Sequence, residues 1–280
     1  MLSYRHGFHA GNHADVFKHL VLTLLVRSLL RKEKPFFYLD THAAAGRYDL
    51  GSAIARKNRE YKTGIGPLWE VKDAPEAILN YLGAARALNS DGKLRFYPGS
   101  PRIVRHYLRP GDRMALSELH PNEVKVLGEE FAGDKQVKIH HLDAYQALKA
   151  LLPPSERRGL VLIDPAFELK DEWRRLLDAV KEAYRRWATG IFAVWYPIQD
   201  RATADDFLRR FKKSGIRKVL VAEFSILDPD ETLRLNGSGM VIINPPWKLE
   251  EELRSLLPWL WEKLAVEGQG TWRVEWLVEE

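Results

Sequence analysis

The sequence predicts an α/β fold built on a seven-stranded, mostly parallel sheet whose last strand is antiparallel. Apolar runs of strand length recur along the 280 residues, at 35–40, 113–119, 137–143, 159–164, 190–196, 217–226 and 239–244. Helix-sized segments separate the first five runs, which is typical of parallel strands joined by crossover helices. Only about a dozen residues join the last two runs, and so short a link favours a hairpin.

The composition is that of a globular protein with a substantial core. Hydrophobic residues make up 45% of the chain, and no apolar run approaches the roughly 20 residues that span a bilayer. The longest run, 19–30, contains Arg27 and predicts a buried helix. The start of the chain lacks a signal-peptide layout, and the absence of cysteine excludes disulfides and thiolate metal sites. We therefore expect a cytoplasmic protein without membrane contact.

The net charge of +5 permits an anionic partner such as nucleic acid, but does not require one.

One connection is longer than a single crossover helix requires. It runs from Gly46 to Asp112, and only its end, 98–109, reads as the crossover helix, with Ser100 as N-cap. We interpret residues 49–96 as a helical insertion that either caps the core or holds substrate. The chain is then a single domain over 1–280, with an N-terminal arm and helix in 1–33.

The loop after the first predicted strand resembles a nucleotide-binding loop only in part. Ligands of such sheets lie beyond the carboxyl ends of the parallel strands. Asp40 ends the first strand, and His42, Ala44 and Gly46 occupy the three places where a nucleotide loop usually has glycine. An ordinary strand-to-helix turn explains this loop as well when it is taken alone.

Acidic residues also end the next two predicted strands. Glu118 could accept hydrogen bonds from both hydroxyls of a ribose, and Asp143, which precedes Ala144, could accept one from an adenine amine. Three acidic strand ends, together with the strand order, predict S-adenosylmethionine (SAM) as cofactor. The predicted fold is that of the class I SAM-dependent methyltransferases, which are Rossmann-like.

Two loops compete for the catalytic position. Enzymes that methylate an exocyclic base amine use Asp or Asn, two prolines and an aromatic residue; 244–247 read Asn-Pro-Pro-Trp, whereas 164–167 read Asp-Pro-Ala-Phe. The catalytic loop follows the fourth strand of this layout. Asn244 ends the antiparallel strand, so it should lie at the opposite end of the sheet, beyond the amino ends of the parallel strands. Position therefore favours Asp164, and residues 244–247 read as a strand terminator before a helix.

The Asp164 loop carries the groups that methylation of adenine N6 needs. The amine lone pair is delocalised into the ring, and acceptors for both amine hydrogens would free it to attack the sulfonium methyl. Asp164 and the Pro165 carbonyl are the expected acceptors. Phe167 is expected to stack on the flipped base, a contact worth about 1–3 kcal/mol.

The N-terminal residues predict a nucleic-acid contact rather than a metal site. Four of the nine histidines lie in the first 19 residues, but histidine-only clusters seldom bind zinc, so we expect no metal. Asn12 reads as an N-cap, with Asp15 three residues further on. Tyr4, Arg5 and His6 interleave aromatic and basic groups, which suits contact with bases and phosphates. A tail packed on the domain explains the same pattern equally well.

Long motifs from one end of the chain to the other resemble a single family. They are "MLSYRHGFHAGNHADVFKH", "YLDTHAAAGRY", "YPGSP", "SELHP", "RRGLVLIDPAFE", "ATGIFAVWYP" and "SGMVIINPPWKLE". The family is the bacterial 23S ribosomal RNA adenine(2030) N6-methyltransferases, whose older label concerns the use of external DNA as a nutrient. The resemblance implies SAM as cofactor and protein-free 23S rRNA as substrate. We expect a monomer without an obligatory protein partner.

By matching position, the resemblance also implies roles for individual residues. Contact with the cofactor is implied for His19, His42, Ser100, Glu118, Asp143, Ala144 and Asp164, to which we add Gly46 from the loop pattern. Asp164 is implied as the catalytic acceptor. Binding of substrate, or closure of the arm over the site, is implied for Tyr4, His6 and Lys18.

The sequence departs from the family pattern in three places. Ala166 and Phe167 stand where the family has proline and tyrosine, and Ala44 and Ala144 stand where it has glycine. Ala166 can adopt the φ of proline, and Phe167 keeps a stacking face. Ala44 is strained if its position requires a positive φ. The same features leave open a DNA adenine N6-methyltransferase, or a nucleic-acid-binding relative without catalysis.

Overall fold

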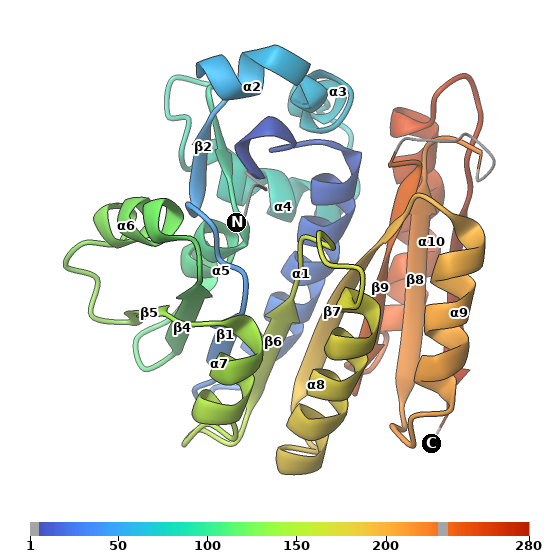
Figure 1. Cartoon of the computed structure of the whole chain (residues 1–280). Coiled ribbons are helices and arrows are strands. Elements are labelled where there is room, and N and C mark those ends of the chain that lie inside the picture. Colours follow the sequence, from blue (N-terminus) through green and yellow to red (C-terminus); the bar gives the residue numbers. More distant parts are fainter. Residues whose placement is uncertain (1–5, 229–234, 280) are drawn as a thin grey trace.

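The chain folds around one eight-stranded sheet in a computed structural model that describes residues 6–228 and 235–279 (Figure 1). From one edge to the other, the strands are β10 (Trp272–Val278), β8 (Val219–Ser225), β9 (Gly237–Ile243), β7 (Ile191–Ile198), β6 (Gly159–Ile163), β1 (Phe37–Asp40), β4 (Arg113–Glu118) and β5 (Val137–His141).

The strand directions confirm the mostly parallel layout predicted from the sequence. Strand β1 pairs in parallel with β4 and β6, and β6 pairs in parallel with β7. Strand β9, the last of the seven predicted strands, runs antiparallel between β7 and β8. The sheet has one strand more than predicted, because β10 adds antiparallel to the edge of β8.

Helices cover both faces of the sheet and make two buried cores (Figure 1). Strand β6 shows the division: Leu160 and Leu162 belong to one core, Val161 and Ile163 to the other, and all four are fully buried. The first core receives α1 (His13–Leu30), α5 (Ser100–Tyr107), α6 (Pro121–Glu130) and α10 (Leu249–Leu264). The second receives α7 (Ala144–Leu151), α8 (Glu172–Arg186) and α9 (Arg201–Lys212).

Helix α1 is buried along most of its length, as the apolar run 19–30 predicts. It begins at the predicted N-cap, because the Asn12 side chain accepts a hydrogen bond from the Asp15 backbone N–H at 2.9 Å. Within the described ranges, no helix is long and apolar enough to cross a membrane. Just before α1 lies the short 3-10 helix η1 (His6–Phe8).

The long connection before α5 folds into short helices closed off by a two-stranded ribbon. Tyr48 pairs with Tyr97 where the chain leaves and re-enters the main domain. The elements are β2 (Arg47–Asp49), α2 (Ala53–Asn58), η2 (Glu60–Lys62), α3 (Ile65–Trp69), α4 (Glu76–Arg86) and β3 (Phe96–Pro98).

The prediction that Ser100 caps α5 is wrong. Gly99 is the N-cap and provides no side-chain hydrogen bond, while Ser100 is the first helical residue. The Ser100 hydroxyl instead donates to Oδ2 of the buried Asp40 at 2.6 Å. Helix α5 is therefore tied by its first residue to the carboxyl end of β1.

Candidate active site

A cavity of about 1190 Å³ lies beyond the carboxyl ends of the parallel strands, between the sheet, the start of α1 and the insertion. It brings together predicted site residues from seven separate segments of the chain. Those that line it are His6, Lys18, His19, His42, Ser100, Glu118, Asp143, Ala144, Asp164, Pro165 and Phe167. The predicted contact Tyr4 lies outside the described residues.

Gly46 is the predicted site residue that the structure does not bring to the cavity wall. It has a φ of +77°, and a Cβ there would approach the Leu127 and Phe131 side chains at 3.0 and 3.1 Å. Its carbonyl accepts the Gly99 N–H at 2.9 Å. Gly46 therefore serves a tight turn packed on α6, and so holds the start of α5 in place.

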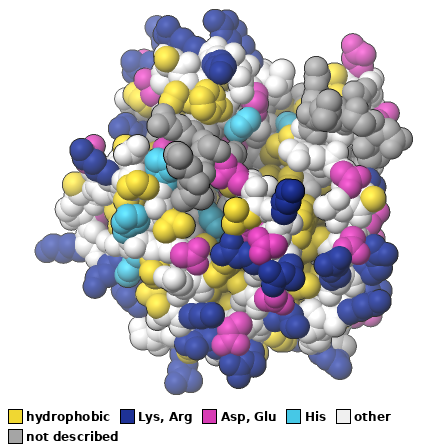
Figure 2. Space-filling model, viewed as in Figure 1, with side chains coloured by type: hydrophobic (Ala, Val, Ile, Leu, Met, Phe, Trp, Pro, Cys, Tyr) yellow, Lys and Arg dark blue, Asp and Glu magenta, His cyan; other side chains and the backbone are white. Residues whose placement is uncertain are grey.

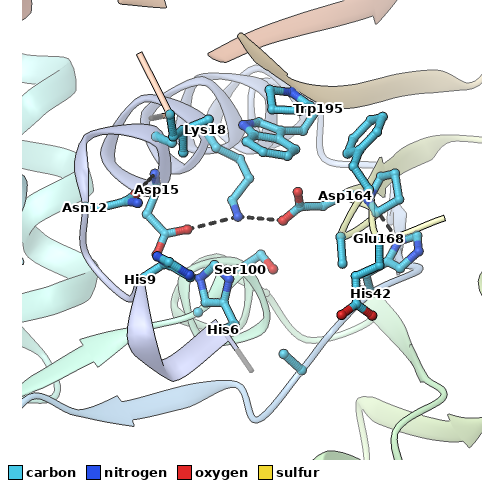
Figure 3. A pocket seen from close by; sticks show the side chains of 18 of the residues that line it. His6, His9, Asn12, Asp15, Lys18, His42, Ser100, Asp164, Glu168 and Trp195 are labelled. Atoms are coloured by element: carbon cyan, nitrogen blue, oxygen red, sulfur yellow. Dashed lines mark hydrogen bonds and ion pairs between the residues drawn. The ribbon is translucent and has the colours of Figure 1, made fainter. Parts of the chain in front are cut away.

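Lys18 joins two carboxylates at the centre of the cavity (Figure 3). Its Nζ lies 2.5 Å from Asp164 Oδ2 and 2.9 Å from Asp15 Oδ1. Burial alone would lower the pKa of Lys18, but the two carboxylates outweigh burial and raise it above its usual value. Lys18 is therefore a permanent cation that holds one oxygen of Asp164.

Asp15 anchors this cluster from the first turn of α1. Burial would raise the pKa of Asp15, but the neighbouring His6 and Lys18 hold it well below its usual range. Its Oδ2 lies 2.9 Å from His6 Nε2 and accepts the Gly11 N–H at 2.9 Å. The sequence interpretation gave Asp15 only a helix-capping role. Its spacing from Lys18, three residues on the same helix, was the available signal.

The loop after β6 presents an aromatic wall to the cavity. Phe167 has a φ of +53°, a backbone conformation that bulky residues rarely adopt. Its ring lies 4.4 Å from that of Trp173 and 6.0 Å from that of Trp195, measured between centroids. Trp195 lines the cavity from β7, and sequence reasoning missed it because it lies inside a predicted strand rather than at its end.

The Asp164 loop also contacts the loop after β1. The Asp164 N–H donates to His42 Nδ1 at 3.3 Å, so the proposed catalytic and cofactor loops face each other as predicted from strand order.

Glu118 supports the loop after β1 and keeps capacity for a ligand. Its Oε2 accepts the Ala44 N–H at 2.8 Å, and its Oε1 accepts the His120 N–H at 2.6 Å. A carboxylate has about four acceptor positions, so hydroxyls of a ribose can still be bound. Burial raises the pKa of Glu118. Ala44 has a φ of +47°, so this position does require the left-handed conformation that favours glycine.

Asp143 offers a second set of acceptors beside β5. Its Oδ1 accepts the N–H groups of Tyr145 and Gln146 at 3.0 and 3.1 Å, and so caps α7. Its Oδ2 has no hydrogen-bond partner within the described chain. An amine such as that of adenine fits this free oxygen, and the Glu118 and Asp143 pair therefore fits the nucleoside half of SAM.

Burial shifts the pKa values of the titratable groups around the loop after β1. Burial lowers the pKa of His42 to about 4 and that of His19 well below its usual value. Burial likewise raises the pKa of Asp40 to about 6, although Ser100 and Tyr38 donate hydrogen bonds to it. Neutral imidazoles do not repel a sulfonium cation, so this wall suits the methionine half of SAM.

The competing Asn-Pro-Pro-Trp loop lies beyond the opposite ends of the strands from the cavity, as the direction of its strand predicts. Ile243 pairs with Phe192, near the start of β7. The Asn244 side chain donates to the carbonyls of Ala188 and Gly190, both at 2.8 Å. Trp247 is 78% exposed. This loop ends a strand and takes no part in the cavity.

Within the described ranges, no three His, Asp or Glu side chains are grouped so that they could hold a metal ion.

The sheet order, the antiparallel β9 and the acidic strand ends around one cavity define a class I SAM-dependent methyltransferase. The family model described as ribosomal RNA large subunit methyltransferase D, RlmJ, matches residues 33–278, and the chain belongs to this family. Its methyl donor is SAM.

Similar proteins match the whole chain. It is 46% identical over 280 residues to the ribosomal RNA large subunit methyltransferase J of Escherichia coli (strain K12), covering 100% of both chains. The protein of the same name from Haemophilus influenzae (strain ATCC 51907 / DSM 11121 / KW20 / Rd) is 48% identical over 281 residues, again with 100% coverage of both. A crystal structure from Legionella pneumophila (strain Philadelphia 1) superposes with a TM-score of 0.89 at 38% identity, covering 96% of this chain and 98% of that one.

Proposed function

We propose that this protein transfers a methyl group from SAM to the exocyclic N6 of an adenine in 23S rRNA. The relatives named as large-subunit rRNA methyltransferases support an rRNA substrate, and the family resemblance points to adenine 2030. The observation that carries the proposal is the position of Asp164, which lines the cavity at the carboxyl end of β6 and contacts the loop after β1. We infer that the enzyme acts in the cytoplasm, where it would meet an rRNA substrate.

In this proposal, the residues that hold SAM are those around the loops after β1, β4 and β5. They are His19, His42, Ser100, Glu118, Asp143 and Ala144. SAM supplies a methyl group made electrophilic by the positive sulfonium sulfur.

Asp164 and its neighbours prepare the amine. Lys18 holds Asp164 Oδ2 at 2.5 Å, whereas Oδ1 has no hydrogen-bond partner in the described part of the chain. Oδ1 and the Pro165 carbonyl then accept one amine hydrogen each, which localises the lone pair on nitrogen. Methylation leaves a cationic amine, and Asp164 takes the proton that this amine loses.

Lys18 acts as a positioning residue in this scheme. Because its ammonium is shared between Asp15 and Asp164, the carboxylate of Asp164 is fixed before the substrate arrives. A fixed acceptor needs no reorganisation during the reaction, which is the main source of electrostatic catalysis.

Phe167 supplies the stacking surface for the flipped adenine, and Trp195 closes the pocket behind it. His6 lies at the cavity wall, where it would contact the substrate, and substrate contact is also the role that we propose for Tyr4. On the face shown in Figure 2, Lys and Arg side chains are spread widely rather than gathered in one patch. We infer that the chain acts as a single methyltransferase domain and as a monomer.

Transfer of label from SAM to protein-free 23S rRNA tests the proposal. We expect incorporation with the wild-type protein, a loss of at least 100-fold with Asp164→Ala, and little incorporation into DNA of the same sequence. Absence of transfer to RNA, or transfer indifferent to Asp164→Ala, contradicts the proposal. A preference for the matched DNA would instead assign the same chemistry to DNA.

A further inference from the structure

The cavity extends beyond the groups used for cofactor binding and methyl transfer to a second polar wall. We call this the insertion-side wall. It consists of His9, Asn12 and His13 at the start of α1, and Asn58, Glu60 and Thr63 from the insertion. In Figure 3, His9 and Asn12 lie on one side of the cavity, His42 and Glu168 on the other, and Lys18 and Asp164 between them.

His13 carries a buried polar atom that nothing in the described structure satisfies. Its side chain is only 8% exposed, it lines the cavity, and Nε2 has no hydrogen-bond partner among the described residues. Burial lowers the pKa of His13 to about 4, so the ring is neutral near pH 7 and can donate or accept. Buried polar atoms usually have a partner, and because His13 lines the cavity, a ligand atom can supply the partner that Nε2 lacks.

The wall is preformed rather than loose. His9 Nδ1 lies 2.9 Å from Glu60 Oε1, and the Asn12 side chain donates to Glu60 Oε2 at 3.0 Å. A Cβ at Gly64 would stand 2.0 Å from the Gly11 carbonyl oxygen, so the insertion backbone lies directly against the segment before α1. These contacts hold the start of α1 and the insertion together as one surface.

The charge of the wall favours an uncharged ligand group. Glu60 is the acidic member and is paired with His9, whose pKa it raises. Among the described residues that line the cavity, the Lys and Arg side chains are Lys18, paired with two carboxylates, and Arg175 on α8. A phosphate bound at this wall would face the Glu60 carboxylate with no Lys or Arg side chain of the wall to balance its charge. The edge of a nucleobase would instead meet groups that donate and accept hydrogen bonds.

A polynucleotide that places one base at Asp164 must also bring a neighbouring base close to it. The insertion-side wall is continuous with the reaction centre, because Asn12 caps Asp15 and Asp15 contacts Lys18, which holds Asp164. Single-stranded RNA is read in this way, through splayed bases whose edges are hydrogen-bonded by side chains.

We propose that the insertion-side wall is a subsite for the base of the nucleotide flanking the target adenosine, with His13 Nε2 as one of its hydrogen-bond partners. This rests on the proposed function, since it requires an RNA substrate. The insertion then has a role in choosing sequence context, separate from the chemistry at Asp164.

The test is a coupling experiment on an RNA fragment that contains the target adenosine. Either neighbour of the target is replaced in turn by an abasic nucleotide, and the KM of each RNA is measured with wild-type protein and with His13→Phe. His106→Phe, on α5 and outside the cavity, is the matched control. Asn58→Ala, an exposed member of the wall, is the second variant, and calorimetry with SAM shows that each variant is folded.

We expect His13→Phe to raise the KM for intact RNA about three- to tenfold with kcat and SAM affinity little changed, and Asn58→Ala to raise it less. One of the two abasic RNAs should show a similar rise with wild-type protein and no further rise with His13→Phe. Strictly additive effects for both neighbours, or equal KM values for His13→Phe and His106→Phe, overturn the subsite while leaving methylation of RNA intact. Failure of the wild-type protein to methylate the intact RNA removes the proposed function and the subsite with it.

Discussion

The loops 164–167 and 244–247 look alike in sequence and lie at opposite ends of the sheet. Asp164 follows β6 and lines the cavity, where it is held by a lysine from α1. Asn244 follows the antiparallel β9, and its side-chain amide donates hydrogen bonds to two backbone carbonyls. The better match to a short motif is thus the strand terminator. Strand direction, which the motif does not encode, decides which loop can reach the cofactor.

The two loops also differ in where they place backbone strain. Each contains a residue with a φ of +53°: Phe167 in one and Asn244 in the other. Asparagine adopts this conformation readily, whereas phenylalanine does so rarely. Strain of this kind persists where the surrounding structure enforces it and is frequent at functional sites. The loop after β6 therefore shows the signature of a site, and the loop after β9 that of an ordinary turn.

The largest difference between the loops should appear in catalysis. Asp164→Ala removes the oxygen that would accept the amine hydrogen, and we expect kcat to fall about 10²- to 10³-fold. Asn244→Ala should leave kcat within about twofold, because its contacts are far from the cavity. Asn244→Ala should instead lower the free energy of unfolding by about 1–3 kcal/mol, because two backbone carbonyls lose their hydrogen-bond donor. Single-turnover rates and urea unfolding of both variants check this, and a reversed pattern would exchange the roles of the loops.

The pH dependence of stability should belong to the cavity. His13 and His42 have pKa values of about 4 in the folded protein, lowered by burial from 6.5. The stability that these neutral histidines contribute is fully present above pH 6.5 and is lost as the pH falls toward 4, because in this range only the unfolded chain takes up protons. Each histidine should therefore lower the free energy of unfolding by about 2 kcal/mol at pH 5 relative to pH 7.5.

Asp40 acts in the opposite direction. Its folded pKa of about 6 lies above the usual 3.8, so the penalty for ionising it is relieved as the pH falls through 6, returning about 1 kcal/mol at pH 5. Together these three groups should lower the free energy of unfolding by about 3 kcal/mol, and the lowered pKa of the buried His19 acts in the same direction. Urea titrations at both pH values measure it. His13→Phe should reduce the difference in the free energy of unfolding between pH 7.5 and pH 5 by about 2 kcal/mol. Asn244→Ala should lower the free energy of unfolding equally at both pH values and leave this difference unchanged.

The aromatic residue of each loop provides the next contrast. Phe167→Leu should raise the KM for RNA about tenfold, because a base stacked on an aromatic ring gains about 1–3 kcal/mol. Trp247→Leu should change the KM for RNA by less than about twofold, because Trp247 is 78% exposed and lies at the end of the sheet away from the cavity. Steady-state kinetics with 23S rRNA compares them. An equal effect would mean that RNA contacts both ends of the sheet.

The smallest effect concerns the loop that faces Asp164. Ala44 has a φ of +47°, and Ala44→Gly should stabilise the protein by about 1 kcal/mol by relieving this strain. Thermal unfolding measures the shift. Ala144→Gly is the control, because Ala144 begins a helix in the ordinary right-handed conformation and should be destabilised by glycine. Loss of stability in Ala44→Gly would show that the positive φ carries no strain.

Much of the fold could be predicted because strands buried on both faces read as unbroken apolar runs, as in Gly159–Ile163. Strand β10 was missed because Arg273 and Glu275 interrupt its run, and it is buried on less of its surface. The short strands β2 and β3 carry three residues each, too few for a pattern.

The site could be predicted where it consists of strand ends, because the carboxyl ends of parallel strands meet at one edge. Asp164 and Glu118 were found in this way. The contact between Lys18 and Asp164 joins residues 146 apart, and that between His9 and Glu60 joins an arm to an insertion. Neither follows from local periodicity, since both depend on how α1 and the insertion pack over the cavity.

The central claim is that methyl transfer to adenine N6 occurs at Asp164 and not at Asn244. Nucleoside mass spectrometry of 23S rRNA from a strain lacking the gene, after treatment with each purified protein and SAM, tests it most directly. We predict N6-methyladenosine as the new methylated nucleoside with wild-type protein and with Asn244→Ala, and at least 100-fold slower formation of it with Asp164→Ala. A methyl group on a different atom, or undiminished N6-methyladenosine with Asp164→Ala, would contradict it.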